Sequence, residues 1–146
     1  MSATFLKVGE TASFAKTITE TDLVLFSGLT GDFDPIHVNE AYARSTPFGK
    51  RIAHGALVMG LLSTTASMMS RRSVERGSTA TSVSLGYDRI RFLKPVFIGD
   101  TLTARYEIEV IDEGALRSRS KVEVTNQDGE LCLAGIHIMK WVANPS

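Results

Sequence analysis

The sequence predicts an α+β fold in which an antiparallel sheet is wrapped around one long central helix. Apolar residues in the first half recur with helical spacing or are interrupted by loop signals, whereas from Ala80 onward they alternate with a period of two. The longest apolar run, 55–69, is long enough for a substantial helix. A chain of 146 residues builds one adequate core, so we expect a single domain over residues 1–146.

The first half is predicted to contain one strand and three helices. The strand is expected near 12–18. The next helix should be capped by Thr19 or Thr21 and end at Gly31, because threonine oxygens accept the free N–H groups of a first turn and glycine adopts the left-handed conformation that ends a helix. A short helix is expected near 39–44.

The third helix, at 55–71, is the strongest in the chain. Its composition is apolar nearly all round, so we expect it to be buried against the sheet. The predicted core-facing residues are Leu57, Leu61, Thr64 or Thr65, and Met68.

Four strands are predicted for the second half, near 79–93, 101–111, 115–125 and 130–142. Turn signals rich in Gly, Asp, Asn and Pro separate consecutive strands. Strand runs joined by short turns favour an antiparallel meander.

Composition excludes several classes of protein. With 43% hydrophobic and 22% charged residues the chain should fold, and 16 Lys+Arg against 16 Asp+Glu leave no basic excess for nucleic acid or an anionic membrane surface. The long apolar run is interrupted by glycine and hydroxyl residues, so we expect no membrane span. Cys132 is the lone cysteine and no export signal is visible, which favours a cytoplasmic location.

The common cofactor motifs are absent. There is no phosphate-binding Walker loop, no dinucleotide-binding glycine pattern and no HExxH metal spacing among the three histidines. The GxSxG elbow of a serine nucleophile is also missing. The sequence therefore carries no motif that indicates a metal, a nucleotide cofactor or a serine nucleophile.

The first candidate for chemistry is the segment 31–37, which holds Asp32, Asp34 and His37. Pro35 lacks a backbone donor and forces Asp34 toward extended geometry, so this segment is predicted to be a kinked loop. An Asp and a His that converge on one pocket can act as a general acid/base pair. The spacing alone favours the other interpretation, a capped turn with a solvated histidine.

The second candidate is His54-Gly55, at the start of the long helix. Free N–H groups at a helix N-terminus can hold a carbonyl oxygen that becomes negatively charged, and glycine permits close approach of a substrate. The alternative is that Gly55 only lets the chain enter the helix tightly while His54 packs nearby.

These two elements resemble the signature of a known family. The run Phe26-Ser27-Gly28-Leu29-Thr30-Gly31-Asp32-Phe33-Asp34-Pro35-Ile36-His37 is similar to that of the MaoC-like dehydratases, the R-specific enoyl-CoA hydratases of hot-dog fold. The resemblance extends to Arg51-Ile52-Ala53-His54-Gly55, to 91–96 with 99–102, and to the hairpin 126–130.

The resemblance implies reversible syn hydration of a trans-2-enoyl-CoA to the (R)-3-hydroxyacyl-CoA, with Asp32 and His37 as the catalytic pair. The backbone N–H of Gly55 would hold the thioester oxygen, with Asp34 and His54 in support. No cofactor is implied, because the thioester itself acidifies the α-carbon. The substrate-binding residues implied are Phe33, Pro35, Ile36 and Leu57.

The resemblance also implies partners. The substrate would be an acyl-CoA, with an acyl-carrier protein as another possible carrier, and the working unit a homodimer or larger homo-oligomer. The acyl chain length stays open, because it depends on the packing of residues such as Leu57, Met59, Leu62 and Met68.

One position departs from the family pattern. The family usually has Asn before the proline, and this chain has Asp34, whose carboxylate cannot donate the hydrogen bonds of an amide. Two other functions remain open on the same fold: a thioesterase, which would use a carboxylate to activate water against the thioester carbon, and a non-catalytic acyl-binding subunit.

Overall fold

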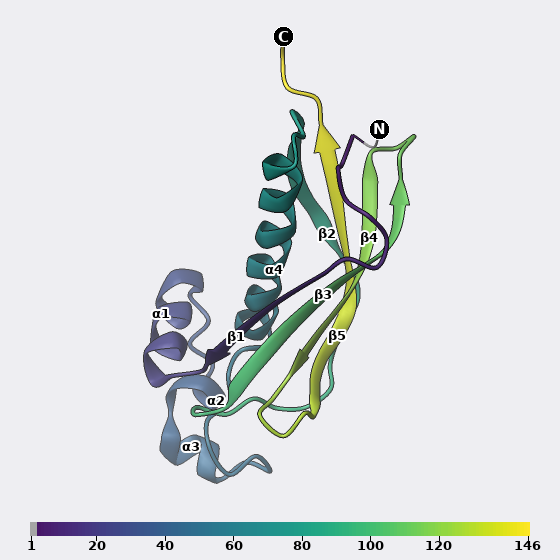
Figure 1. Ribbon diagram of the computed structural model, residues 1–146. Coiled ribbons are helices and arrows are strands. Elements are labelled where there is room, and N and C mark those ends of the chain that lie inside the picture. Colours follow the sequence, from purple (N-terminus) through teal and green to yellow (C-terminus); the bar gives the residue numbers. More distant parts are fainter. Residues whose placement is uncertain (1–2) are drawn as a thin grey trace.

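The computed structural model describes residues 3–146 and consists of a five-stranded antiparallel sheet curved around one long helix (Figure 1). The strand order is β1-β3-β4-β5-β2. The strands are β1 (Thr11–Thr17), β2 (Thr81–Phe92), β3 (Thr101–Asp112), β4 (Arg117–Thr125) and β5 (Leu131–Val142), and the helices are α1 (Glu20–Thr30), α2 (Pro35–Val38), α3 (Glu40–Arg44) and α4 (Gly55–Glu75).

The predicted meander is right for β3, β4 and β5 and wrong for β2, which pairs with β5 at the far edge. The connection 93–100 is therefore a crossing segment and not a hairpin. It is fixed at three places: Leu93 donates its N–H to Cys132, Val96 accepts the N–H of Ala53, and Gly99 donates to Ile18. These backbone bonds tie it to β5, to the chain before α4 and to the end of β1.

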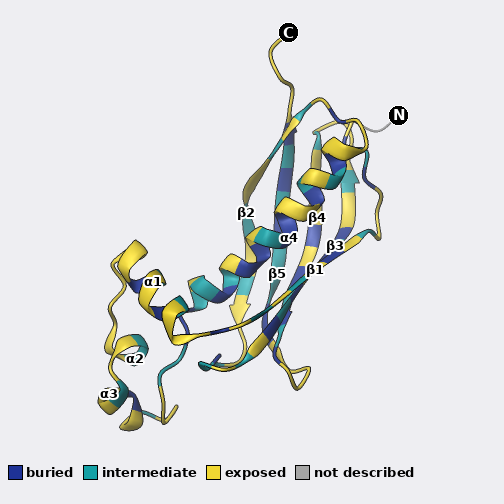
Figure 2. Cartoon of the chain, turned by 60° about the vertical axis from the view of Figure 1, so that its left-hand side comes forward, coloured by how far each residue is buried: buried dark blue, intermediate teal, exposed yellow. Residues whose placement is uncertain are grey.

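Helix α4 has a different buried face from the predicted one. Leu61 and Thr65 are buried as expected, but Leu57 is only half-buried and Met68 is 40% exposed, with Met69 buried in its place. Because the helix is apolar nearly all round, its composition could not specify the face, and contact with the sheet did. Figure 2 shows the exposed side of α4 facing away from the sheet. The buried residues are Val58, Leu61, Leu62, Thr65, Ala66, Met69 and Ser73.

The core lies between this face of α4 and the inner face of the sheet. Tyr106, Ile108, Val122 and Trp141 are among its sheet residues, and each is almost fully buried. Burying an apolar side chain of this kind, rather than leaving it exposed, stabilises the folded state by about 1.5–3 kcal/mol. The indole N–H of Trp141 donates to Ser73 Oγ at 3.0 Å, so the one polar atom of this side chain is satisfied.

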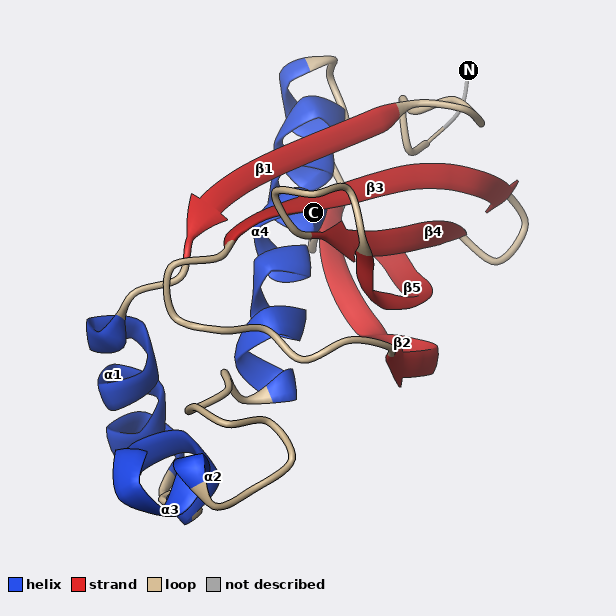
Figure 3. Cartoon of the chain, turned by 90° about the horizontal axis from the view of Figure 1, so that it is seen from below, coloured by secondary structure: helices blue, strands red, loops and turns tan. Residues whose placement is uncertain are grey.

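Helices α1, α2 and α3 stand beyond the end of the sheet, next to the N-terminus of α4 (Figures 1 and 3). Helix α1 begins with a capping box between Thr19 and Asp22 and ends at Gly31, which has a φ of 81°. The Arg51 guanidinium pairs with Glu20 at 2.6 Å and Glu40 at 2.9 Å, so one half-buried cation joins α1 to α3. This arrangement fixes the segment between them.

Candidate active site

The segment 31–37 is not the continuous loop that the sequence predicts. Asp34 is extended, with φ −53° and ψ 131°, as expected for a residue before proline. Pro35 then occupies the first position of α2, where a missing backbone N–H costs nothing because that donor has no intrahelical partner. His37 therefore projects from a short helical turn and not from a loop.

His37 is held by one hydrogen bond that specifies its tautomer. Its Nδ1 lies 2.8 Å from the carbonyl oxygen of Ile52, which can only accept, so Nδ1 carries the proton. The other nitrogen, Nε2, lies 3.9 Å from Asp32 Oδ2. This separation is too long for a direct hydrogen bond. In the neutral ring Nε2 is therefore a free base that faces a carboxylate across a gap.

The two carboxylates of the segment have different surroundings. Asp32 Oδ1 accepts the N–H of Asp34 at 3.1 Å, and the side chain is 48% exposed. Asp34 Oδ1 accepts the N–H of Ile36 at 3.0 Å and thereby caps α2. Asp34 thus acts on the backbone of its own turn, while Oδ2 of Asp32 is directed at His37.

His54 lies directly behind this pair. It is 2% exposed, and its ring stacks on that of His37 with 3.8 Å between centroids. Its Nε2 lies 3.2 Å from the carbonyl oxygen of Asp32 and 3.1 Å from Ser27 Oγ, so the ring fixes the backbone that carries Asp32. Burial lowers the pKa of His54, which keeps this imidazole neutral. Its Nδ1 has no hydrogen-bond partner within residues 3–146.

Gly55 begins α4, and the side chain of the N-cap residue, His54, makes no capping hydrogen bond in the part of the chain that the structure describes. The first intrahelical bond is donated by Val58 to the carbonyl of His54, so the N–H groups of the preceding three residues have no partner within the helix. A Cβ at position 55 would lie 2.8 Å from the Phe92 ring. A larger residue at this position would require the Phe92 ring, at the end of β2, to move away from α4.

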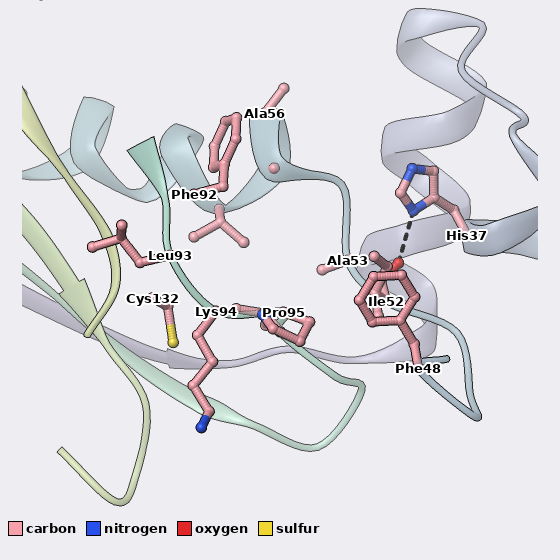
Figure 4. A pocket seen from close by; sticks show the side chains of 13 residues that line it. His37, Phe48, Ile52, Ala53, Ala56, Phe92, Leu93, Lys94, Pro95 and Cys132 are labelled. Carbon is pink, nitrogen blue, oxygen red and sulfur yellow. Dashed lines mark hydrogen bonds between the residues drawn. The ribbon is translucent and has the colours of Figure 1, made fainter. Parts of the chain in front are cut away.

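An apolar cavity of about 450 Å³ connects His37 with the N-terminus of α4 (Figure 4). Of the predicted site residues, His37 and Gly55 line it. The substrate-binding set does not: Phe33 is 61% exposed, and Pro35, Ile36 and Leu57 are not among the lining residues.

Sequence reasoning missed most of the cavity wall. Phe48 comes from the break before α4, Phe92 from the end of β2, and Leu93 and Val96 from the crossing segment. The sequence did contain a signal for these wall residues, because the family resemblance includes the block 91–96, but it assigned no role to that block. These residues come together only because β2 and the crossing segment pass beside α4. The remaining lining residues are Ile52, Ala53, Ala56, Val58, Lys94, Pro95 and Cys132.

Asp32, His37 and His54 also form a group whose potential metal-ligand atoms lie within 4.8 Å of one another. The stacked rings do not aim their nitrogen lone pairs at one point, and Nε2 of His54 is already hydrogen-bonded to a carbonyl. The geometry therefore fits proton transfer better than coordination of an ion.

No helix within the described residues is long and apolar enough to cross a membrane.

Comparison with curated proteins gives consistent relatives. The chain is 46% identical over 99 residues to the (R)-specific enoyl-CoA hydratase of Rhodospirillum rubrum; the match covers 68% of this chain and 63%, less than two thirds, of that protein. It is 31% identical to the (R)-specific enoyl-CoA hydratase of Aeromonas caviae, covering 96% and 98% of the two chains. It is 37% identical to the 3-hydroxybutyryl-CoA dehydratase of Methylorubrum extorquens, covering 92% and 80%.

The solved structures that resemble this chain include proteins of the same kind as these relatives. The (R)-hydratase from A. caviae superposes with a TM-score of 0.80 at 29% identity, covering 93% of this chain and 97% of that one. The R-hydratase PhaJ1 from Pseudomonas aeruginosa gives 0.82 at 31% identity, covering 98% and 86%. A sheet wrapped around one helix, shared with these hydratases, is the hot-dog fold. Because the family model of the MaoC like domain also matches residues 5–130, the chain belongs to the MaoC-like domain family.

Proposed function

We propose that this protein is an R-specific enoyl-CoA hydratase, a hydro-lyase that adds water reversibly to a trans-2-enoyl-CoA and yields the (R)-3-hydroxyacyl-CoA. The observation that carries the proposal is the orientation of His37, which lines an apolar cavity, has its Nδ1 held by the Ile52 carbonyl and faces Asp32 Oδ2 with its Nε2 across 3.9 Å. The gap suits one bound water, and the cavity suits an acyl chain. The relatives named above support the same activity.

The mechanism follows from these positions. His37 Nε2 removes a proton from the water as its oxygen bonds to C3 of the substrate, and the electrons of the double bond move onto the thioester as an enolate. The proton then passes through Asp32 to C2, so that H and OH of one water are added on the same face. His37 returns to its neutral form.

Gly55 is proposed to stabilise the enolate. Its N–H has no partner within α4, and Gly55 is one of the residues that line the cavity. A donor aimed at a developing oxyanion commonly contributes about 3–4 kcal/mol to the transition state. Asp34 and His54 would support the pair by fixing the turn and the backbone of Asp32.

The proposed partners are an acyl-CoA, or an acyl-carrier protein as an alternative carrier, and a second copy of the chain. β2 is an edge strand of 12 residues with Val83 and Leu85 exposed, and long edges of this kind are pairing templates. We therefore propose at least a homodimer. An active monomer in sedimentation at assay concentration would contradict this.

A cytoplasmic location is also proposed, since the single cysteine is free and buried.

The test of the activity uses crotonyl-CoA. We expect its conjugated absorbance to fall on addition of enzyme without release of free thiol, and the product to be the R isomer. Thiol release without loss of conjugation would instead indicate a thioesterase. Neither change, with binding of acyl-CoA retained, would indicate a non-catalytic subunit.

A further inference from the structure

Helix α1 is exposed along most of its length, and two of its residues are buried. These are Leu23, which is fully buried, and Ser27, which is 1% exposed. A buried serine loses its hydrogen bonds to water, so its hydroxyl needs a partner inside the protein to offset that loss. Ser27 has this partner in His54, 27 residues later in the sequence, with 3.1 Å between Oγ and Nε2.

His54 supplies the proton of this contact. Its Nε2 also lies 3.2 Å from the carbonyl oxygen of Asp32, which can only accept a hydrogen bond. A proton on Nδ1 instead would set the lone pair of Nε2 against that oxygen. The neutral ring therefore carries its proton on Nε2, and this one N–H is shared between the Asp32 carbonyl and Ser27 Oγ in a three-centre hydrogen bond.

Ser27 also holds the backbone that leads into Asp32. Its carbonyl accepts the N–H of Gly31 at 2.8 Å, at the left-handed residue that ends α1. Asp32 itself donates its N–H to Thr30 Oγ1 at 3.3 Å, and its carbonyl accepts from His54. Ser27 therefore supports Asp32 in two ways, directly through the helix end and indirectly through His54.

The spacing between Asp32 and His37 depends on this support. The side chain of Asp32 is 48% exposed, and its Oδ2 lies 3.9 Å from His37 Nε2 without a direct hydrogen bond. When two groups must act on one water, a displacement of about 1 Å can lower the rate roughly a hundredfold. The backbone of Asp32 must therefore be held in place for the pair to work together.

The ring that Ser27 binds also supports His37. The rings of His54 and His37 are stacked, with 3.8 Å between their centroids and 26° between their planes. Phe26, the neighbour of Ser27 on α1, packs against the His54 ring at 4.7 Å between centroids. A rotation of His54 would disturb both the Asp32 carbonyl and the stacked ring of His37. One hydroxyl on α1 is thus linked to both members of the pair.

We propose that Ser27 is a positioning residue of the active site, whose hydroxyl orients His54 and thereby sets the spacing between Asp32 and His37. The inference rests on the proposed hydratase activity. Ser27 is buried and is not among the residues that line the apolar cavity, so it acts through His54 and not on the substrate. Its loss should therefore lower kcat and leave KM nearly unchanged.

The experiment measures kcat and KM for crotonyl-CoA in a double-mutant cycle. We expect Ser27→Ala to lower kcat about tenfold and to change KM less than about twofold. His54→Phe keeps an aromatic ring but removes the N–H. In that background Ser27→Ala should change kcat less than about twofold, because the hydroxyl no longer has an N–H to bind.

Ser73→Ala is the matched control. Ser73 is also a fully buried helical serine, and its Oγ accepts the indole N–H of Trp141 near the other end of α4. This variant should unfold at a lower temperature than the wild type but keep its kcat. The comparison separates a general loss of packing from a loss of positioning.

Two further measurements decide the matter if Ser27→Ala folds poorly. His54→Gln, whose side-chain amide can donate in place of Nε2, should keep a higher kcat than His54→Phe. Nitrogen-15 NMR of the wild type should show His54 protonated on Nε2, with the signals assigned by their absence from His54→Gln.

The outcomes separate the two proposals. If the wild type does not hydrate crotonyl-CoA, the hydratase activity is refuted, and the catalytic role of Ser27 with it. If the wild type is active but Ser27→Ala keeps its kcat, or loses the same factor in both backgrounds, only the positioning role is refuted. A proton on Nδ1 of His54, or equal kcat in His54→Gln and His54→Phe, would also overturn that role.

Discussion

The neighbours of His37 determine which of its nitrogens can act as a base. Because the carbonyl of Ile52 accepts from Nδ1, the lone pair of the neutral ring lies on Nε2, the nitrogen nearer to Asp32. His54 stacks behind the ring and limits its rotation. One backbone acceptor and one aromatic contact therefore convert a half-buried histidine into an oriented base.

Asp32→Asn and His37→Gln should each remove nearly all hydratase turnover. Both groups serve one water, so the double variant should be little slower than either single one. Single-turnover rates with crotonyl-CoA measure this, and circular dichroism checks that these partly exposed side chains are not needed for folding. Near-wild-type turnover in either single variant would refute the catalytic pair.

Asp34→Asn should keep activity within about tenfold, because an amide oxygen can still accept the N–H of Ile36 and cap α2. Asp34→Ala loses the cap, which costs about 1 kcal/mol in a typical helix, and should be slower than the Asn variant. The pH dependence of kcat/KM for both variants is the measurement. Equal rates and profiles would exclude a supporting role, and collapse of the Asn variant would make Asp34 a catalytic carboxylate.

At the scale of elements, the start of α4 and the end of β2 lie in contact, and both line the apolar cavity. Gly55→Ala places a Cβ 2.8 Å from the Phe92 ring, which must then move. We expect kcat for crotonyl-CoA to fall about tenfold or more, since the helix N-terminus and the cavity wall shift together, and Gly55→Ala with Phe92→Ala should recover part of this loss.

Gly60→Ala is the matched control on the same helix. A Cβ there meets nothing within 4 Å, and replacing a helical glycine with alanine stabilises a helix by up to about 1 kcal/mol. Equal activity in the two glycine variants would show that the contact with Phe92 does not matter.

At the scale of the whole molecule, stability should depend on pH through the histidine that is buried between sheet and helix. Burial lowers the pKa of His137 to about 4, whereas in the unfolded chain it is near 6.5. Between these values the unfolded state binds the proton and the folded state does not, so stability falls as pH falls. The loss from His137 is about 2 kcal/mol by pH 5 and about 3 kcal/mol below pH 4.

Denaturant unfolding at fixed protein concentration, at pH 7.5 and pH 5, measures this loss. Burial lowers the pKa of His54 as well, which adds to the loss in the same direction. His137→Phe should be less stable at neutral pH, because Tyr106 and Ser84 lose their partner, but its pH dependence should be flatter. An unchanged pH dependence in this variant would contradict the argument.

The sequence by itself determined the class of fold and the chemistry of the turn. The change of period near Ala80 predicted helices before strands, and the fixed φ of Pro35 set the extended geometry of Asp34 whatever surrounds it. These features are local, since the residues concerned impose their own backbone preferences. The family resemblance of the segment 26–37 is local for the same reason.

Only the tertiary structure decided which surfaces meet. The buried face of α4, the pairing of β2 with β5 and the wall of the apolar cavity all depend on contacts between residues distant in sequence. When a helix is apolar nearly all round, its sequence periodicity does not show which face is buried. Likewise, alternation of apolar and polar residues in a strand does not show which strand it pairs with. Packing against the sheet determined the buried face of α4, and the crossing segment 93–100 placed β2 beside β5. Together they bring Phe92 next to Gly55.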